Sequence, residues 1–144
     1  MAVIDDELYL NIYDIETIQI KKKKEYDIKK IIKFLDQYSP DNTLAVIENI
    51  HAYGSDSANR AFCFGEGFGV LKGVLTSYGF DYKLVTPQTW KNFVFGTKIN
   101  ENIKNISISK ALSLFPDSAK WIKLKKHHNR AEALLIAYYG IQNF

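Results

Sequence analysis

The order of hydrophobic and polar positions predicts that the chain begins with two antiparallel strands. Met1–Asp5 is a short apolar run, and in Glu7–Thr17 apolar and polar residues alternate as they do in a half-buried strand. A turn joins the two runs, and Ile18 and Ile20 extend the second strand. The run Lys21–Lys24 that follows is typical of a solvated loop or a sheet edge.

A helix and a further strand come next. Asp27 has the position of an N-cap before apolar residues at helical spacing, and Ser39-Pro40 ends that helix. Leu44–His51 then opens on four consecutive apolar residues, which predicts a central strand buried on both faces. Glu48 stands at its carboxyl end, where ligands collect in open α/β sheets. Glu48 is therefore either a ligand-binding carboxylate or a residue paired with a lysine just outside the sheet.

The next predicted element is a long helix over Ser57–Tyr78, closed by Gly79. Within it Gly65, Gly69 and Gly73 recur every four residues and therefore lie along one face. Each glycine inside a helix costs about 1 kcal/mol relative to alanine. A smooth glycine face lets another backbone approach closely, and that backbone belongs either to the underlying sheet or to a second copy of the same helix.

The remainder reads as one more strand followed by helices. Phe80–Val85 predicts a strand, and Thr86-Pro87 starts a helix that stops near Gly96. A polar loop over Asn100–Asn105 and a helix over Ser107–Leu114 come next. A basic segment over Ser118–Lys126 and a last helix over Asn129–Ile141 follow. This order predicts an α/β protein with a mixed sheet, antiparallel first and parallel later, flanked by helices in a single domain over residues 1–144.

Composition adds limits on location and chemistry. No apolar run is long enough to cross a membrane and the N-terminus has no signal-peptide pattern, so we expect a cytoplasmic protein without a membrane partner. A single cysteine, Cys63, excludes an internal disulfide, and its apolar surroundings predict a core position. Residues 1–88 carry 10 Lys and Arg against 13 Asp and Glu, while residues 89–144 carry 9 against 3. This imbalance suits a polyanion held near bound cations, and it equally suits a plain lysine-rich surface.

A second unusual carboxylate lies in the last predicted helix. Glu132 is surrounded by Ala and Leu, which predicts a buried turn, and Asn129 and His128 stand three and four residues before it on the same face. Together with Glu48 these side chains form a candidate divalent-cation site, because oxygen ligands with one imidazole fit Mg²⁺ or Mn²⁺. Two such ions about 4 Å apart would stabilise both oxygens of a phosphodiester displacement. Alternatively, Glu132 pairs with Arg130 or a lysine, and the histidines lie at the surface.

Several stretches together resemble the RuvC family, in particular the phage and bacterial RuvC-like Holliday junction resolvases. They span nearly all of the chain in the order of the family: Ala45–Asn49, the glycine-spaced helix, Val85–Lys91, Leu114–Pro116 and His128–Leu134. The resemblance implies a ribonuclease H-like fold and Mg²⁺-dependent cleavage of branched DNA such as four-way junctions. It also implies a homodimer whose long helices meet at a two-fold axis, where Gly65, Gly69 and Gly73 would lie, and the cytoplasm of a bacterial host if the protein is phage-encoded.

By position, the resemblance makes Glu48 the strand carboxylate and Glu132 the helix carboxylate, with Asn129 where relatives carry another Asp or His ligand. The family also has a first strand with an Asp-x-Gly motif whose Asp bridges the metals. Met1–Asp5 best matches the second strand of the family, and no Asp-x-Gly precedes it. Either the chain starts late, or Asp5 or Asp6 takes that role.

Candidate DNA contacts are less specific than the carboxylates. Lys98, Lys104 and Lys110 lie near where the family contacts phosphates, and Lys120–Lys126 adds a row of basic residues. His51 and Tyr53 follow the strand that carries Glu48 and are suited to stacking on unpaired bases. Each is equally an ordinary surface residue. The leading hypothesis is thus a structure-selective endonuclease. The alternative is a nuclease-inactive DNA-binding or assembly module with the same fold. A nucleotide-binding α/β protein is disfavoured because no glycine-rich loop follows an early strand.

Overall fold

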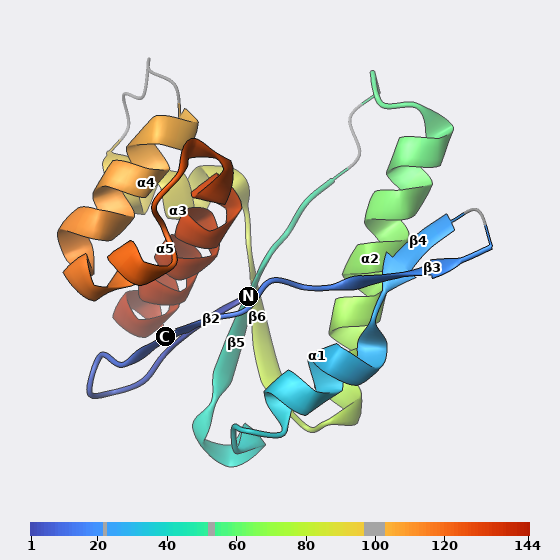
Figure 1. The fold of residues 1–144 in the computed structure, drawn as a ribbon, viewed down its shortest axis with the longest axis horizontal. Coiled ribbons are helices and arrows are strands. Elements are labelled where there is room, and N and C mark those ends of the chain that lie inside the picture. Colours follow the sequence, from blue (N-terminus) through green and yellow to red (C-terminus); the bar gives the residue numbers. More distant parts are fainter. Residues whose placement is uncertain (22, 52–53, 97–102) are drawn as a thin grey trace. The chain divides into compact units, whose positions relative to one another are not determined.

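The computed structural model describes residues 1–21, 23–51, 54–96 and 103–144. These residues form a mixed α/β structure in which small antiparallel and parallel sheets are flanked by helices (Figure 1). They fall into two compact units: Met1–Asp14 with Val85–Phe144 form the first, and Ile15–Leu84 form the second. The mixed α/β prediction is confirmed at this level, whereas the single domain stays a prediction.

The first unit combines a β-hairpin with helices. Strands β1 (Ala2–Ile4) and β2 (Leu10–Ile12) pair antiparallel with Val3 opposite Asn11, which confirms the predicted start of the chain. The helices are α3 (Pro87–Phe95), α4 (Ile103–Leu114) and α5 (His128–Asn143). Two 3-10 turns, η2 (Pro116–Lys120) and η3 (Lys125–His127), connect α4 to α5.

Helix α5 is central to the packing of this unit, because it contacts α4, α3 and β1. Leu134 and Leu135 of α5 and Trp90 of α3 are completely buried. The ring of Phe93 on α3 lies edge-on to that of Tyr139, with 5.4 Å between their centroids. Burying one large apolar side chain stabilises a fold by about 1.5–3 kcal/mol, so this apolar face fixes the position of α5.

The second unit combines a hairpin, helices and a parallel strand pair. Its elements are β3 (Thr17–Ile20), β4 (Lys23–Tyr26), α1 (Ile28–Leu35), the 3-10 turn η1 (Pro40–Asn42), β5 (Leu44–Glu48), α2 (Ala58–Ser77) and β6 (Asp81–Val85). Strands β5 and β6 are neighbours and run in the same direction (Figure 1). Val85, the last residue of β6, belongs to the first unit. Ile31, Phe34 and Phe80 are buried in the core.

The helix ends agree closely with the sequence signals. The Asp27 side chain accepts a hydrogen bond from the Lys30 amide at the start of α1, and Thr86 does the same for Thr89 at the start of α3. Gly79 follows α2 with φ +78°, and Gly96 ends α3 with φ +83°, a conformation that favours glycine. Local capping chemistry is sufficient to fix these boundaries.

The hairpin β3–β4 corrects the prediction for residues 18–24. Ile18 and Ile20 do not extend the strand before them but form β3, and Lys23 and Lys24 pair with it as part of β4. Lys21 starts the turn with φ +54°. The lysine run concealed the turn because it contains no Gly, Asn or Asp to mark one. The hairpin is one strand pair more than the sequence pattern predicts.

The prediction of a fully buried central strand at β5 is wrong. In the described part of the chain β5 has a single partner strand, β6, and Leu44 is 39% exposed while Ala45–Glu48 are half-buried. The core position predicted for Cys63 is also wrong, because its side chain is exposed on α2. Helix α2 is apolar on several sides, so the apolar pattern does not specify which side is covered; Phe62 beside it is 64% exposed.

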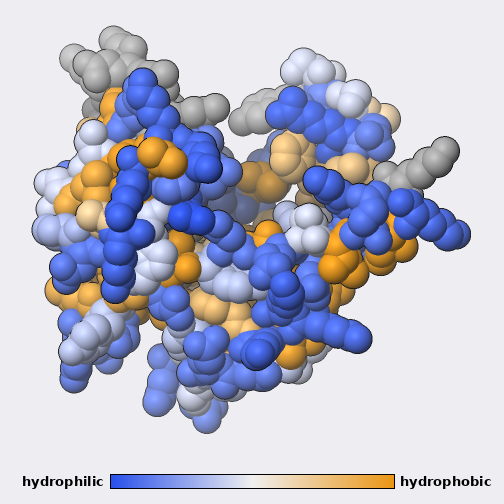
Figure 2. Space-filling view, viewed as in Figure 1, coloured by the Kyte–Doolittle hydropathy of each residue, from blue (hydrophilic) through white to orange (hydrophobic). Residues whose placement is uncertain are grey.

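Hydrophobic residues occur at the surface beside hydrophilic ones, as the space-filling view shows in orange and blue (Figure 2). On the hairpin, Ile18 and Ile20 are 42% and 43% exposed. Among the described residues no helix is both long and apolar enough to span a membrane.

Candidate functional site

Glu48 is the last residue of β5, as predicted, and its side chain is half-buried. The backbone turns directly after it, with the Ile50 amide donating to the Glu48 carbonyl oxygen at 3.1 Å. His51 follows and is exposed. The carboxyl end of a strand with a parallel neighbour thus presents one carboxylate, which is the setting in which α/β proteins place ligand-binding side chains.

The second candidate group lies in the first turns of α5. His128 and Glu132 are half-buried, and Asn129 between them is exposed. The Nδ1 atom of His128 lies 3.3 Å from the Lys125 carbonyl oxygen, which favours the tautomer that carries its proton on Nδ1 and leaves Nε2 as an acceptor. The helix therefore brings His128, Asn129 and Glu132 together on adjacent turns, as their spacing predicts.

Glu48 belongs to the second unit and Glu132 to the first. The prediction that they share one metal site stays a prediction. Within residues 1–21, 23–51, 54–96 and 103–144, no three His, Cys, Asp or Glu side chains gather closely enough to hold a metal ion.

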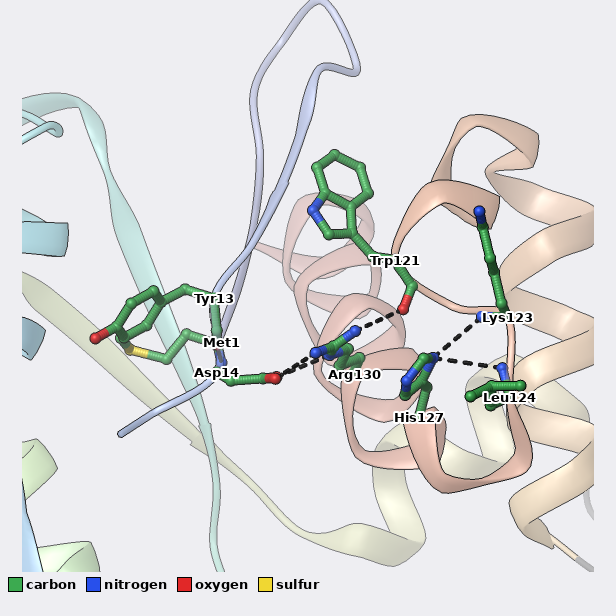
Figure 3. Close-up of polar contacts among 8 residues, drawn as sticks. All are labelled: Met1, Tyr13, Asp14, Trp121, Lys123, Leu124, His127 and Arg130. Atoms are coloured by element: carbon green, nitrogen blue, oxygen red, sulfur yellow. Dashed lines mark hydrogen bonds and ion pairs between the residues drawn. The ribbon is translucent and has the colours of Figure 1, made fainter. Parts of the chain in front are cut away.

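The start of α5 is fixed by an ion pair that sequence reasoning did not find (Figure 3). Arg130 Nε donates to Asp14 Oδ1 at 2.8 Å, its Nη2 donates to Asp14 Oδ2, and its Nη1 donates to the Trp121 carbonyl oxygen at 2.8 Å. These bonds hold the pKa of Asp14 below its ordinary value and raise that of Arg130. The guanidinium of Arg130, which the sequence offered as an alternative partner for Glu132, therefore binds the Asp14 carboxylate through Nε and Nη2.

His127, immediately before α5, organises the turn that precedes it. Its Nδ1 accepts hydrogen bonds from the amides of Lys123 at 3.1 Å and Leu124 at 3.3 Å (Figure 3). Desolvation, followed by the positive charges of Arg130 and Lys126, lowers the pKa of His127. A lowered pKa keeps the imidazole neutral, and only a neutral imidazole leaves Nδ1 as an acceptor.

The predicted DNA contacts fall in different parts of the structure. Lys110 lies in α4 and is half-buried, and Lys104 lies in the first turn of the same helix. Tyr53 and Lys98 lie outside the described residues. These contacts therefore stay predictions.

The glycine face of α2 is open. A Cβ atom added at Gly65, Gly69 or Gly73 would meet no heavy atom within 4 Å, so the described chain does not use this face for a close backbone contact. The close approach occurs on the opposite side of α2, where a Cβ at Gly67 would lie 2.9 Å from Cε2 of Tyr26. Among the described residues the sheet therefore does not pack closely on this face, and the contact with a second copy of the helix stays a prediction.

No protein-family model matches the chain, and a comparison with curated proteins finds no significant match.

Proposed function

We propose that this protein is a RuvC-type, metal-dependent endonuclease with a ribonuclease H-like fold, which resolves Holliday junctions or other branched DNA. The observation that carries the proposal is the position of its two distinctive carboxylates. Glu48 ends a strand that has a parallel neighbour, and Glu132 lies half-buried in an apolar helix, each within a RuvC-like stretch of sequence. A nuclease of this kind needs carboxylates on rigid elements to hold its cations.

The donor set fits Mg²⁺, and also Mn²⁺, by chemical type. Glu48 and Glu132 supply carboxylate oxygens and Asn129 an amide oxygen, which are hard ligands suited to these ions. When bound, the metal supplies an activated water and stabilises the charge that develops on the cleaved phosphodiester. We assign a role in proton transfer to His128, whose Nδ1 lies 3.3 Å from the Lys125 carbonyl oxygen and which shares a helix face with Glu132.

Branched DNA would be held by basic and aromatic side chains outside this group. We assign phosphate contacts to Lys98, Lys104 and Lys110, and stacking on unpaired bases to His51 and Tyr53. The open face at Gly65, Gly69 and Gly73 supports a homodimer, because two such faces allow two helix backbones to approach closely. Two active sites related by a two-fold axis would suit a junction with two strands to cut.

A second candidate is a nuclease-inactive module that binds DNA or assembles on it. One sequence feature favours it: Asn129 is a neutral and hence weaker cation ligand than Asp. In that case the fold and the DNA contacts would be retained while the metal chemistry is lost.

Cleavage and binding of a synthetic four-way junction separate the two candidates. The protein is incubated with the labelled junction, or with a linear duplex of matched sequence, in Mg²⁺, Mn²⁺ or EDTA. Symmetrical cuts in the junction that need Mg²⁺ or Mn²⁺ support the endonuclease. Junction binding without cuts in either metal supports the inactive module. Absence of junction binding overturns both.

A further inference from the structure

Four lysines are presented by the segment that links α4 to α5. Lys120, Lys123, Lys125 and Lys126 are all exposed, and we call Lys120–Lys126 the basic strip. Among the described residues none forms an ion pair with these lysines, whereas lysines elsewhere do, such as Lys23 with Glu66. The segment between Pro116 and Arg130 contains a single acidic residue, Asp117. The basic strip is therefore a row of cations whose charge no ion pair within the described ranges neutralises.

The backbone of the basic strip is held at several points rather than being a loose loop. The side chain of Ile122 is buried at 1% exposure, so it anchors the middle of the segment in the core. Arg130 Nη1 binds the Trp121 carbonyl oxygen at 2.8 Å, and His127 Nδ1 accepts from the Lys123 and Leu124 amides (Figure 3). Arg130 is in turn fixed by Asp14.

A fixed backbone matters because binding normally loses affinity to the ordering of flexible groups. Lysines carried on an ordered backbone start from fixed Cα positions, so only their side chains remain to be ordered when a ligand binds. Repeated negative charge at regular spacing is the property of a nucleic-acid backbone, and neutralised phosphates release counterions on binding. Lys120 additionally lies 4.0 Å from the ring centroid of Trp121, which adds an aromatic surface to the strip.

We propose that the basic strip is a preformed binding surface for the phosphate backbone of duplex DNA, and that the Asp14–Arg130 pair holds it in shape. This inference rests on the proposed function, which supplies DNA as the polyanion, and it adds a contact surface beyond Lys98, Lys104 and Lys110. The competing occupant is an anionic lipid surface, because Leu124 within the strip is 52% exposed.

The strip is tested by DNA binding in EDTA, where cleavage does not interfere. One variant carries Gln at Lys120, Lys123, Lys125 and Lys126. The matched control carries Gln at four exposed lysines of the second unit, Lys21, Lys24, Lys29 and Lys33. Both variants lower the formal net charge from +3 by the same four charges. Affinity for a labelled duplex is measured by fluorescence anisotropy across a salt series.

The strip variant is expected to bind at least about tenfold more weakly than the control, with the slope of log K against log salt reduced by about 2 to 4. Equal affinity and equal slope for the two variants would overturn the proposal. The competing occupant is tested by measuring how the same variants bind vesicles that contain phosphatidylserine. Vesicle binding that depends on the strip while duplex binding does not would overturn it as well.

The role of the ion pair is tested by Asp14→Asn. Removing a negative charge should by itself tighten binding to DNA, whereas loosening the strip should weaken it. We expect binding about threefold weaker than wild type with an unchanged circular dichroism spectrum, because preorganisation is lost. Tighter or unchanged binding contradicts the positioning role. A protein that binds duplex through the strip but never cuts junctions would overturn the endonuclease and leave this inference standing. A protein that cuts junctions but whose duplex affinity does not depend on the strip would overturn this inference and leave the endonuclease standing.

Discussion

Arg130 and Asp14 are 116 residues apart in the sequence, yet the Arg130 guanidinium donates hydrogen bonds to both carboxylate oxygens of Asp14. The pair ties Asp14, the second residue after β2, to the first turn of α5. Arg130 Nη1 also donates to the Trp121 carbonyl oxygen, which lies in the segment before that helix. One ion pair thereby connects three parts of the first unit at the point where Asn129 and Glu132 are presented.

The Asp14–Arg130 pair should make the stability of the protein depend on pH in the acid range. Because the pKa of Asp14 is lowered in the folded state, the stabilisation is complete above its ordinary value of about 3.9 and is lost as the pH falls through the folded value. Asp14 is 59% exposed, so we expect Asp14→Asn to cost only about 1 kcal/mol or less at neutral pH. Urea unfolding of wild type and Asp14→Asn at pH 7 and near pH 2 measures this. A difference that is the same at both pH values would contradict the assignment.

Gly67 and Tyr26 should be energetically coupled. Alanine is favoured over glycine within a helix by about 1 kcal/mol, but a Cβ at Gly67 would press on the Tyr26 ring. We therefore expect Gly67→Ala to leave the free energy of unfolding unchanged or lower it in the wild type, and to raise it by about 1 kcal/mol in a Tyr26→Ala background. Chemical denaturation of the four proteins of this double-mutant cycle gives the coupling directly. Equal effects in both backgrounds would show that the ring does not fill this position.

The open glycine face should be the dimer interface of the proposed resolvase. Gly69→Leu places a branched side chain where two backbones would meet, and we expect it to convert the dimer to monomer in sedimentation velocity experiments. Arg60→Leu, at an exposed position on the side of the helix opposite Gly69, is the control and should remain dimeric. Monomeric wild type, or a dimer insensitive to Gly69→Leu, would remove the support that this face gives to the proposal.

The accuracy of sequence reasoning differs between elements for physical reasons. Asp27 and Thr86 identify helix starts because a capping side chain bonds an amide three residues away, which is a purely local interaction. The hairpin β3–β4 was not predicted because Lys21 adopts a positive φ although no Gly, Asn or Asp marks a turn there. Burial of β5 was overestimated, since four apolar residues do not specify how many strands flank them.

Some features of the candidate site follow from the sequence and others do not. His128, Asn129 and Glu132 follow from helical spacing, so their arrangement on α5 was predictable. The ion pair of Arg130 with Asp14 was not, because no pattern in either stretch indicates a partner so far away in sequence. The bonds from His127 to the amides before it depend likewise on the conformation of an irregular segment, which no periodicity describes.

The measurement that tests the central proposal most directly is the rate of four-way junction cleavage in Mg²⁺ by the wild type, Glu48→Gln and Glu132→Gln. Each substitution keeps the shape of the side chain and removes the charge that would hold the cation. Glu7→Gln, at an exposed turn, is the control. We expect cleavage to fall by about a hundredfold or more in Glu48→Gln and Glu132→Gln, with junction binding in EDTA retained, and to be unchanged in Glu7→Gln. Cleavage at the wild-type rate by Glu48→Gln or Glu132→Gln would contradict the proposal that these two carboxylates form the active site.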